Sequence, residues 1–197
     1  MLQTAPVMIA YVSWFIFVLA WNMLDRSSKT VAAAGAARER VYGLVLVLGL
    51  TLMVVAPAFL PRGRMWTNPP VVDGAMLLVI AAGIAWCWWA RWHLGRLWSA
   101  AVTHKEGHRV VDTGPYGFVR HPIYTGFIVI YVGMAIICTT VLALVAVLVI
   151  TFGLWLKARV EEQFLIEELG AAYDAYRART PMLMPRMSRR PGAHAST

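Results

Sequence analysis

The chain has 197 residues, of which 59% are hydrophobic and 14% are charged, and its mean hydropathy is +0.62. These values exclude an ordinary soluble domain, in which about half of the residues are apolar and about a quarter are charged. The net charge of +8 does not indicate a nucleic-acid-binding module, because the basic residues lie beside the ends of apolar runs. The composition predicts an integral membrane protein.

Four apolar runs predict the transmembrane helices. The first three, at about residues 6–24, 41–60 and 72–92, each have the roughly 20 residues that a helix needs to cross about 30 Å of hydrocarbon. The fourth, residues 122–156, would extend roughly 50 Å as one helix, so we expect two helices that turn near Cys138-Thr139-Thr140. The predicted fold class is an all-α integral membrane protein with about five transmembrane helices, the last two forming a tight hairpin.

The distribution of Lys and Arg predicts the orientation of these helices. With five spans, sixteen of the eighteen basic residues fall on one side of the membrane, and only Arg62 and Arg64 fall on the other. Because cytoplasmic loops carry an excess of Lys and Arg, we expect a multi-pass protein with its N-terminus outside and its C-terminus in the cytosol. No basic residue precedes the first apolar run, which is therefore predicted to remain as a span rather than to be a cleaved signal.

Two segments remain outside the predicted bilayer, at about residues 93–121 and 157–185, and any chemistry must lie there. The second is predicted to be a helix that leaves the membrane and is interrupted at Gly170. Lys157 and Glu161 are four residues apart in it, which places them on one helix face. An ordinary surface ion pair is the alternative interpretation of that spacing.

The most informative segment is a polar and aromatic run placed directly before an apolar one, Gly114-Pro115-Tyr116-Gly117-Phe118-Val119-Arg120-His121-Pro122-Ile123-Tyr124. Ionisable groups at a membrane boundary are typical of functional sites. The prolines restrict the backbone, the glycines allow close approach of a ligand, and the tyrosines offer ring faces with hydroxyl groups. This inventory suits a flat ligand of cationic or mixed charge.

A metal site is not predicted. His104 and His108 are four residues apart, but Gly107 weakens a helix between them and no third ligand is apparent. Cys87 and Cys138 fall inside predicted spans without metal-ligand spacing, so we assign them to packing.

The ordered combination of motifs resembles the isoprenylcysteine carboxyl methyltransferase family, within a wider group that includes phospholipid N-methyltransferases. The motifs are His108-Arg109-Val110-Val111, Gly114-Pro115-Tyr116, Arg120-His121-Pro122-Ile123-Tyr124, Glu161-Glu162, Gly170, Tyr173, Tyr176 and Pro181. The resemblance covers residues 95–185, which we interpret as a methyltransferase-like core. The apolar runs before it predict an N-terminal three-span membrane region (1–94), and the composition of the end of the chain predicts a flexible basic tail (186–197).

The resemblance also implies a cofactor, S-adenosylmethionine, bound on the cytosolic side without a Rossmann domain. The residues that it assigns to the cofactor, together with Arg120 on grounds of charge, are His108, Arg109, Val110, Val111, Tyr116, Arg120, His121, Pro122, Ile123, Tyr124 and Glu161. A carboxylate at Glu161 can pair with the amino group of the donor, and Arg120 or His121 could meet its carboxylate. A tyrosine face near the sulfonium would contribute about 0.5–2 kcal/mol.

On the substrate side, the family commonly has an Arg four positions before this glutamate, and this chain has Lys157. A lysine keeps the charge but loses the bidentate fork, which weighs against a prenylcysteine carboxylate as the substrate. Arg159 lies on a different helix face and compensates only if the helix is distorted. Lys157, Arg159 and Glu162 are the candidates for substrate-facing or catalytic-base residues.

The expected function is S-adenosylmethionine-dependent methylation of a lipophilic acceptor at the cytosolic membrane interface, with the bilayer as the other partner and no nucleic acid or metal. A phospholipid or thiol methyltransferase of the same fold is an alternative. A membrane reductase that uses NADPH, with Arg186, Arg189 and Arg190 at the 2′-phosphate, and a non-enzymatic membrane scaffold also stay open. The sequence leaves the acceptor and the oligomeric state undetermined.

Overall fold

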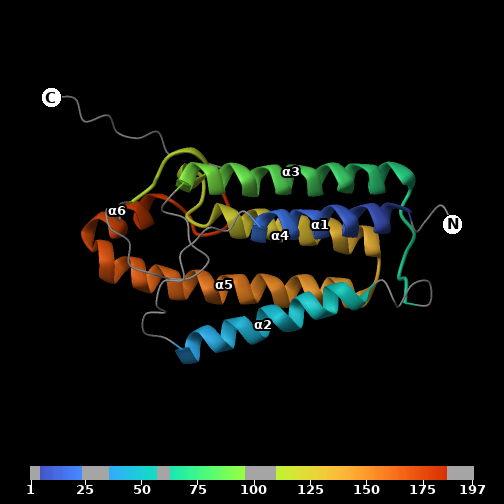
Figure 1. The fold of residues 1–197 in the computed structure, drawn as a ribbon, viewed down its shortest axis with the longest axis horizontal. Coiled ribbons are helices and arrows are strands. Elements are labelled where there is room, and N and C mark those ends of the chain that lie inside the picture. The colour runs from blue at the N-terminus through green and yellow to red at the C-terminus, as the bar shows by residue number, and fades with distance from the viewer. Residues whose placement is uncertain (1–4, 24–35, 57–62, 96–109, 186–197) are drawn as a thin grey trace.

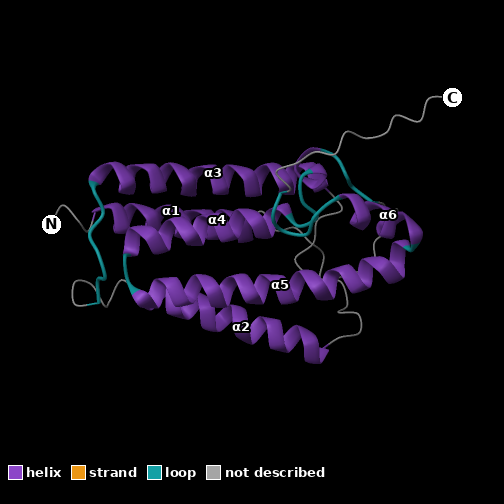
Figure 2. Ribbon diagram, turned by 180° about the vertical axis from the view of Figure 1, so that it is seen from behind, coloured by secondary structure: helices purple, strands orange, loops and turns teal. Residues whose placement is uncertain are grey.

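The computed structural model describes residues 5–23, 36–56, 63–95 and 110–185, and it is an elongated bundle of antiparallel helices (Figure 1). The helices are α1 (Ala5–Met23), α2 (Ala36–Val55), α3 (Pro70–Leu94), the short 3₁₀-helix η3 (Gly114–Gly117), α4 (Pro122–Cys138), α5 (Val141–Leu169) and α6 (Ala171–Arg179). The described ranges contain helices and loops without a β-strand (Figure 2). The predicted all-α fold class is confirmed.

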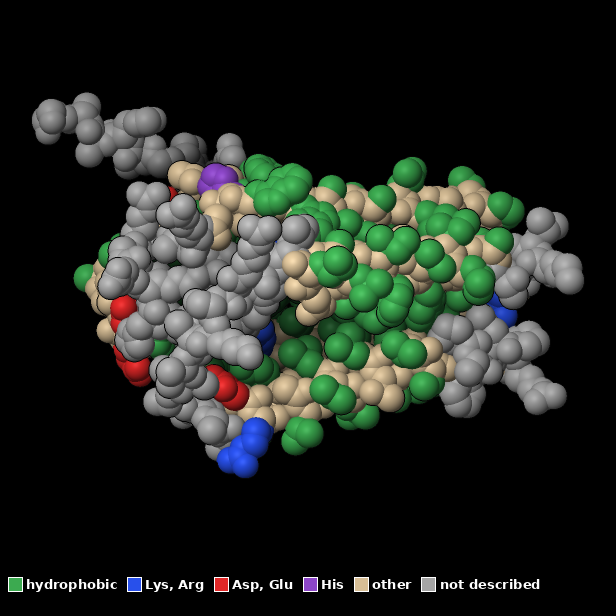
Figure 3. All heavy atoms as spheres, viewed as in Figure 1, with side chains coloured by type: hydrophobic (Ala, Val, Ile, Leu, Met, Phe, Trp, Pro, Cys, Tyr) green, Lys and Arg blue, Asp and Glu red, His purple; other side chains and the backbone are tan. Residues whose placement is uncertain are grey.

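The length and composition of the helices fit a membrane protein. Three of them, α1, α3 and α5, are long and apolar enough to cross a membrane, and α4 is a shorter apolar helix of 17 residues. The first turn of α2 contains Arg38, Glu39 and Arg40, so its apolar part is shorter than the helix. Large apolar side chains cover the visible length of the bundle (Figure 3), and several, such as Leu78 and Leu148, are more than two thirds exposed. So extensive an apolar surface is expected to face lipid.

The α4–α5 turn lies where the length of the fourth apolar run predicts it. Thr139 adopts the left-handed conformation with a φ of 55°, and the Thr140 hydroxyl oxygen accepts a hydrogen bond from the Ala143 amide at 3.2 Å. A threonine at the N-cap satisfies one of the free amides of the helix start. Arg64 Nε donates to Thr139 Oγ1 at 2.9 Å and secures the turn. These contacts explain how the chain turns here without glycine or proline.

Close packing of α3 on α4 fixes the start of α4 beside the last turns of α3. A Cβ atom at Gly126 would collide with Cys87 Sγ, and one at Gly83 would lie 3.2 Å from the Gly126 carbonyl oxygen. Small residues of this kind let two helix backbones approach closely. α4 also contacts α5, which packs extensively on α2, while α1 packs on α3 and α4.

The helix ends and loops that contain the predicted site residues lie at one end of the bundle. The end of α3, η3, the start of α4, the end of α5 and α6 lie together at this end, which we call the site end, whereas the α4–α5 turn lies at the opposite end (Figures 1 and 2). The interruption predicted at Gly170 is confirmed, because Gly170 has a φ of 53° and separates α5 from α6. The short α6 is thereby turned back toward η3.

Candidate active site

The polar segment before α4 folds as η3 followed by a tight entry into the helix. Gly114 has a φ of 57°, a conformation that glycine adopts without the steric cost of a side chain. Pro115 and Pro122 occupy the first turns of η3 and α4, where the missing amide hydrogen costs nothing. His121 is the N-cap residue of α4. The two prolines and the glycine thus fix the backbone that carries Arg120 and His121.

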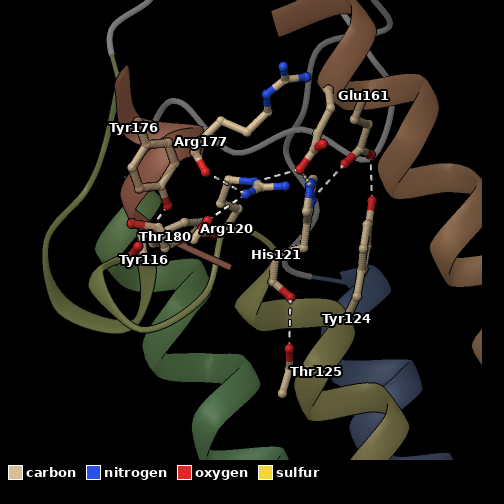
Figure 4. Close-up of polar contacts among 10 residues, drawn as sticks. Tyr116, Arg120, His121, Tyr124, Thr125, Glu161, Tyr176, Arg177 and Thr180 are labelled. Atoms are coloured by element: carbon tan, nitrogen blue, oxygen red, sulfur yellow. Dashed lines mark hydrogen bonds and ion pairs between the residues drawn. The ribbon is translucent and has the colours of Figure 1, made fainter. Parts of the chain in front are cut away.

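A buried ion-pair cluster of Arg120, His121 and Glu162 lies at the centre of the site, and Figure 4 shows its two members from the polar segment, Arg120 and His121. Arg120 Nε donates a hydrogen bond to Glu162 Oε1 at 2.6 Å, and His121 Nε2 lies 3.3 Å from the same oxygen. The three side chains are less than 10% exposed. A buried charge requires a partner of opposite sign, so Glu162 is held by two cationic groups.

His121 bridges the two neighbouring glutamates. Its Nδ1 lies 3.5 Å from Glu161 Oε2, while its Nε2 faces Glu162. Burial acts to lower the pKa of His121, but the hydrogen bonds to Glu161 and Glu162 outweigh it, so that the pKa is raised above its usual value. The imidazolium form is therefore favoured, and it can donate to both carboxylates.

The second part of the site, which we call the rim, consists of Tyr124, Lys157 and Glu161. The Tyr124 hydroxyl donates to Glu161 Oε1 at 2.5 Å, and Lys157 Nζ lies 4.0 Å from the same oxygen. Lys157 Nζ is also 5.5 Å from the centroid of the Tyr124 ring, within range of a cation–π contact. The side chains of Lys157 and Glu161 are 20% and 21% exposed. Lys157 and Glu161 are thus the more exposed charged groups of the site, whereas Tyr124 is buried.

A segment after α6, residues 180–183, runs across the start of α4 and supplies four consecutive carbonyl acceptors. Arg120 Nη1 donates to the Thr180 oxygen, and the amides of Arg120 and His121 donate to the oxygens of Pro181 and Met182 at 2.9 and 3.1 Å. Thr125 Oγ1 donates to the Leu183 oxygen at 2.7 Å. We call residues 180–183 the strap, because it fastens the polar segment to the C-terminal part of the chain.

The structure brings together six of the predicted site residues and separates others from them. Arg120, His121, Tyr124 and Glu161 lie together, with Tyr116 close by in η3 (Figure 4). Glu162 joins them through its contacts with Arg120 and His121, and Lys157 through its contact with Glu161. The backbone oxygens of Pro122 and Ile123 face α3, where they accept from Trp86 Nε1 and Cys87 Sγ.

The remaining predicted residues lie elsewhere. Arg159 points away from the cluster, since its guanidinium lies 5.6 Å from the Trp155 ring and the residue is exposed on an undistorted α5. Val110 and Val111 are half-buried in the loop before η3. His108, Arg109 and the arginines at 186, 189 and 190 lie outside the described residues, as do His104 and the segment around it. Among the side chains that the structure describes, no group of three or more His, Cys, Asp and Glu could hold a metal ion.

Sequence reasoning missed three contributors to the site. His93 at the end of α3 contacts η3, Thr125 binds the strap, and Tyr42 of α2 lies within electrostatic range of Glu161 and Tyr124. Thr125 directly follows Tyr124, the last residue of the polar segment, and this position was a usable signal. Tyr42 and His93 lie at the ends of other apolar runs, and no pattern in the sequence connects them with residues 110–124.

Comparisons with known proteins indicate the family of this chain. Residues 75–167 match the isoprenylcysteine carboxyl methyltransferase family. The nickel-cobalt-cadmium resistance protein NccN of Alcaligenes xylosoxydans xylosoxydans is 35% identical over 77% of this chain and 67% of its own length. The protein-S-isoprenylcysteine O-methyltransferase of Saccharomyces cerevisiae is 36% identical over 42% of this chain, and methanethiol S-methyltransferase 2 of Bradyrhizobium diazoefficiens is 39% identical over 36% of it. The chain spans 36% and 27% of the lengths of these two enzymes.

The fold is an all-α membrane bundle with a charged site at one end, and the relatives include proteins named as O- and S-methyltransferases. Together with the family match, these findings indicate the class of the protein, a membrane methyltransferase. The chain belongs to the isoprenylcysteine carboxyl methyltransferase family. The resemblance predicted from the motifs is confirmed.

Proposed function

We propose that this protein transfers a methyl group from S-adenosylmethionine to a lipophilic acceptor, at a site on the cytosolic face of the membrane. The observation that carries the proposal is the partly exposed carboxylate of Glu161, which His121, Tyr124 and Lys157 surround at one end of an apolar bundle. A charged site of this kind lies where a polar donor from water and an apolar acceptor from the bilayer can meet. The excess of basic residues in the loops that adjoin this end supports its cytosolic orientation.

The residues of the rim suit this cofactor in charge and shape. S-adenosylmethionine supplies a methyl group on a cationic sulfonium, and it also has an amino group and a carboxylate. Glu161 provides a carboxylate for the amino group, and the ring of Tyr124 beside it, which already lies 5.5 Å from the Lys157 ammonium, suits a cation. Arg120 is engaged with Glu162 and the strap, so its expected contribution is to hold the site in place.

The chain's own contribution to methyl transfer is positioning and exclusion of water. His121 and Tyr124, whose rings are parallel with centroids 5.4 Å apart, fix the two oxygens of Glu161 in one orientation. Pre-organised groups of this kind lower the entropic cost of aligning two reactants. An ionised acceptor needs no further proton transfer. A neutral one must lose a proton, and the accessible rim is the part of the site that can take part in this step.

The test is retention of radiolabelled S-adenosylmethionine and of NADPH by the detergent-purified protein, followed by transfer of label to an acceptor. Binding of S-adenosylmethionine that His121→Ala and Glu161→Ala weaken supports the proposal. Retention of NADPH alone would support a reductase instead, and retention of neither by folded protein would support a scaffold.

A thiol is the second candidate acceptor, and Lys157 is the observation that favours it. Its ammonium group is a compact single charge 4.0 Å from Glu161, which suits the one sulfur atom of a thiolate better than the two oxygens of a carboxylate. The relative from Bradyrhizobium diazoefficiens is named as a methanethiol methyltransferase. A screen that offers an alkyl thiol and a prenylcysteine in parallel separates the two acceptors, and Lys157→Arg is expected to improve use of the carboxylate relative to the thiol.

A further inference from the structure

His93, in the last turn of α3, contacts the polar segment from outside the charged cluster. Its Nε2 lies 2.8 Å from Thr113 Oγ1, which is a hydrogen bond. Its ring stacks on the ring of Tyr116, with the centroids 6.4 Å apart and the planes inclined by 23°. One side chain of α3 thus contacts η3 through both a polar atom and a ring face.

Gly114 shows how closely η3 is fitted to this ring. A Cβ atom at residue 114 would lie 2.8 Å from Cε1 of His93 and 2.9 Å from its Nδ1. The φ of 57° at Gly114 also disfavours any side chain. The loop can therefore lie on the imidazole only because residue 114 is glycine.

The opposite side of η3 is held by α6. The Tyr176 hydroxyl donates a hydrogen bond to the Tyr116 carbonyl oxygen at 2.7 Å, and the Tyr116 amide donates to the Thr113 oxygen at 3.2 Å. Tyr116 is 8% exposed, and this buried residue has contacts from both α3 and α6. Tyr176 holds the backbone of this residue, whereas His93 is the contact to its ring from α3.

We propose that His93 is a positioning residue of the cofactor site, which fixes η3 and thereby the ring of Tyr116. The identity of the ligand in this inference rests on the proposed function, because Tyr116 is one of the residues expected to contact S-adenosylmethionine. His93 itself acts through Thr113, Gly114 and Tyr116, and its contacts with these residues account for its position.

Three variants separate the two contacts of His93. His93→Ala removes both, His93→Gln keeps a donor for Thr113, and His93→Phe keeps a ring for Tyr116. Trp92→Ala is the matched control, because Trp92 lies on the same helix turn and is 74% exposed. The first readout is hydrogen exchange of the amides of residues 113, 114 and 116–119 without ligand, and the second is the dissociation constant for S-adenosylmethionine.

The expected result is faster exchange of these amides in His93→Ala and a dissociation constant raised about tenfold, from loss of one hydrogen bond and one ring contact. His93→Gln and His93→Phe should each restore part of both effects, and Trp92→Ala should resemble the wild type. Unchanged exchange in His93→Ala overturns the proposal, and so does unchanged affinity together with faster exchange. If the wild type binds no S-adenosylmethionine, the proposed function fails, and the exchange readout still decides whether His93 holds the loop.

A second test uses the glycine. Gly114→Ala alone should accelerate exchange strongly, because the added Cβ collides with the His93 ring and the backbone is strained. Adding His93→Ala to it removes the collision but not the strain. The increase in exchange rate in the double variant, expressed as a free energy, should therefore be smaller than the sum of the increases in the two single variants. Additive effects would show that the imidazole does not lie on residue 114.

Discussion

Glu161 and Glu162 are adjacent in the sequence, yet they lie in two different parts of the site. The side chain of Glu162 is 6% exposed and is held by Arg120 and His121, whereas that of Glu161 is 21% exposed and belongs to the rim. Successive residues of a helix point about 100° apart. Glu162 therefore faces Arg120 and His121, while Glu161 faces Tyr124 and Lys157.

The two neighbouring glutamates are therefore expected to have different roles, Glu162 in stability and Glu161 in ligand binding. Glu162 neutralises a buried guanidinium that also fastens the strap, so its loss should affect the fold of the whole site end. Glu161 keeps an accessible carboxylate beside aromatic rings, so its loss should affect binding first. His121 contacts both residues and couples the two parts.

The largest effect is expected from Glu162→Ala. Removing one partner of a buried ion pair leaves the other charge unpaired, which typically lowers the free energy of unfolding by about 3–5 kcal/mol. Unfolding of the detergent-purified variant, monitored by circular dichroism, measures this loss. A decrease below about 1 kcal/mol would mean that Arg120 does not depend on Glu162.

The next effect is expected from Glu161→Ala, and it concerns binding. A hydrogen bond to a charged group is worth about 1.5–3 kcal/mol, which corresponds to roughly a 10- to 150-fold loss of affinity for S-adenosylmethionine. Calorimetry on the variant measures it, and Glu161→Gln, which keeps the shape of the side chain, is the matched control for charge. Affinity equal to that of the wild type would remove Glu161 from the ligand site.

The coupling through His121 predicts a pH dependence. The folded-state pKa of His121 is raised above its usual value by the two glutamates, which outweigh burial. Its contribution to stability is therefore complete below the unfolded-state pKa, at about pH 6.5, and is lost as the pH rises through the folded-state pKa. The difference in unfolding free energy between the wild type and His121→Gln should decrease from pH 6 upward. A difference that stays constant across this range would contradict a charged His121.

A smaller effect is expected from the strap. Thr125→Val removes the hydrogen bond to the Leu183 oxygen and should lower the unfolding free energy by about 1 kcal/mol. Thr125→Ser keeps a hydroxyl and serves as the control. Limited proteolysis of the C-terminal part should be faster in the valine variant, and equal rates in both variants would show that this bond does not hold the strap.

The smallest effect is expected from Arg159→Ala. Its guanidinium contacts only an exposed ring among the interactions described for it, and such contacts are worth about 0.5–1 kcal/mol. Affinity for S-adenosylmethionine, measured beside that of Lys157→Ala, should stay at the wild-type value. A large loss would place Arg159 in the site despite its position.

Much of the fold could be predicted from the sequence because the apolar runs have the lengths of transmembrane helices. The hairpin of α4 and α5 followed from the length of one run, although the threonine turn has no glycine or proline. The pair of Lys157 and Glu161 followed from helical spacing and is confirmed at 4.0 Å. These features depend on local geometry, which a sequence specifies directly.

The division between Glu161 and Glu162 could not be predicted, because it depends on how α4 and the strap pack on α5. Arg120 could equally have met either carboxylate, or a ligand, from its sequence position alone. The carbonyl acceptors of the strap have no side-chain signature at all. Tertiary contacts of backbone groups, rather than residue types, therefore decide which charge is buried and which remains accessible.

We propose that Glu161 binds the cofactor while Glu162 maintains the fold. The most direct measurement is the shift in thermal unfolding midpoint that saturating S-adenosylmethionine produces in Glu161→Gln and in the wild type. A ligand at about 100 times its dissociation constant stabilises a protein by about 2.7 kcal/mol. We expect Glu161→Gln to unfold near the wild-type midpoint without ligand and to show little shift with it. A shift equal to that of the wild type would contradict the claim.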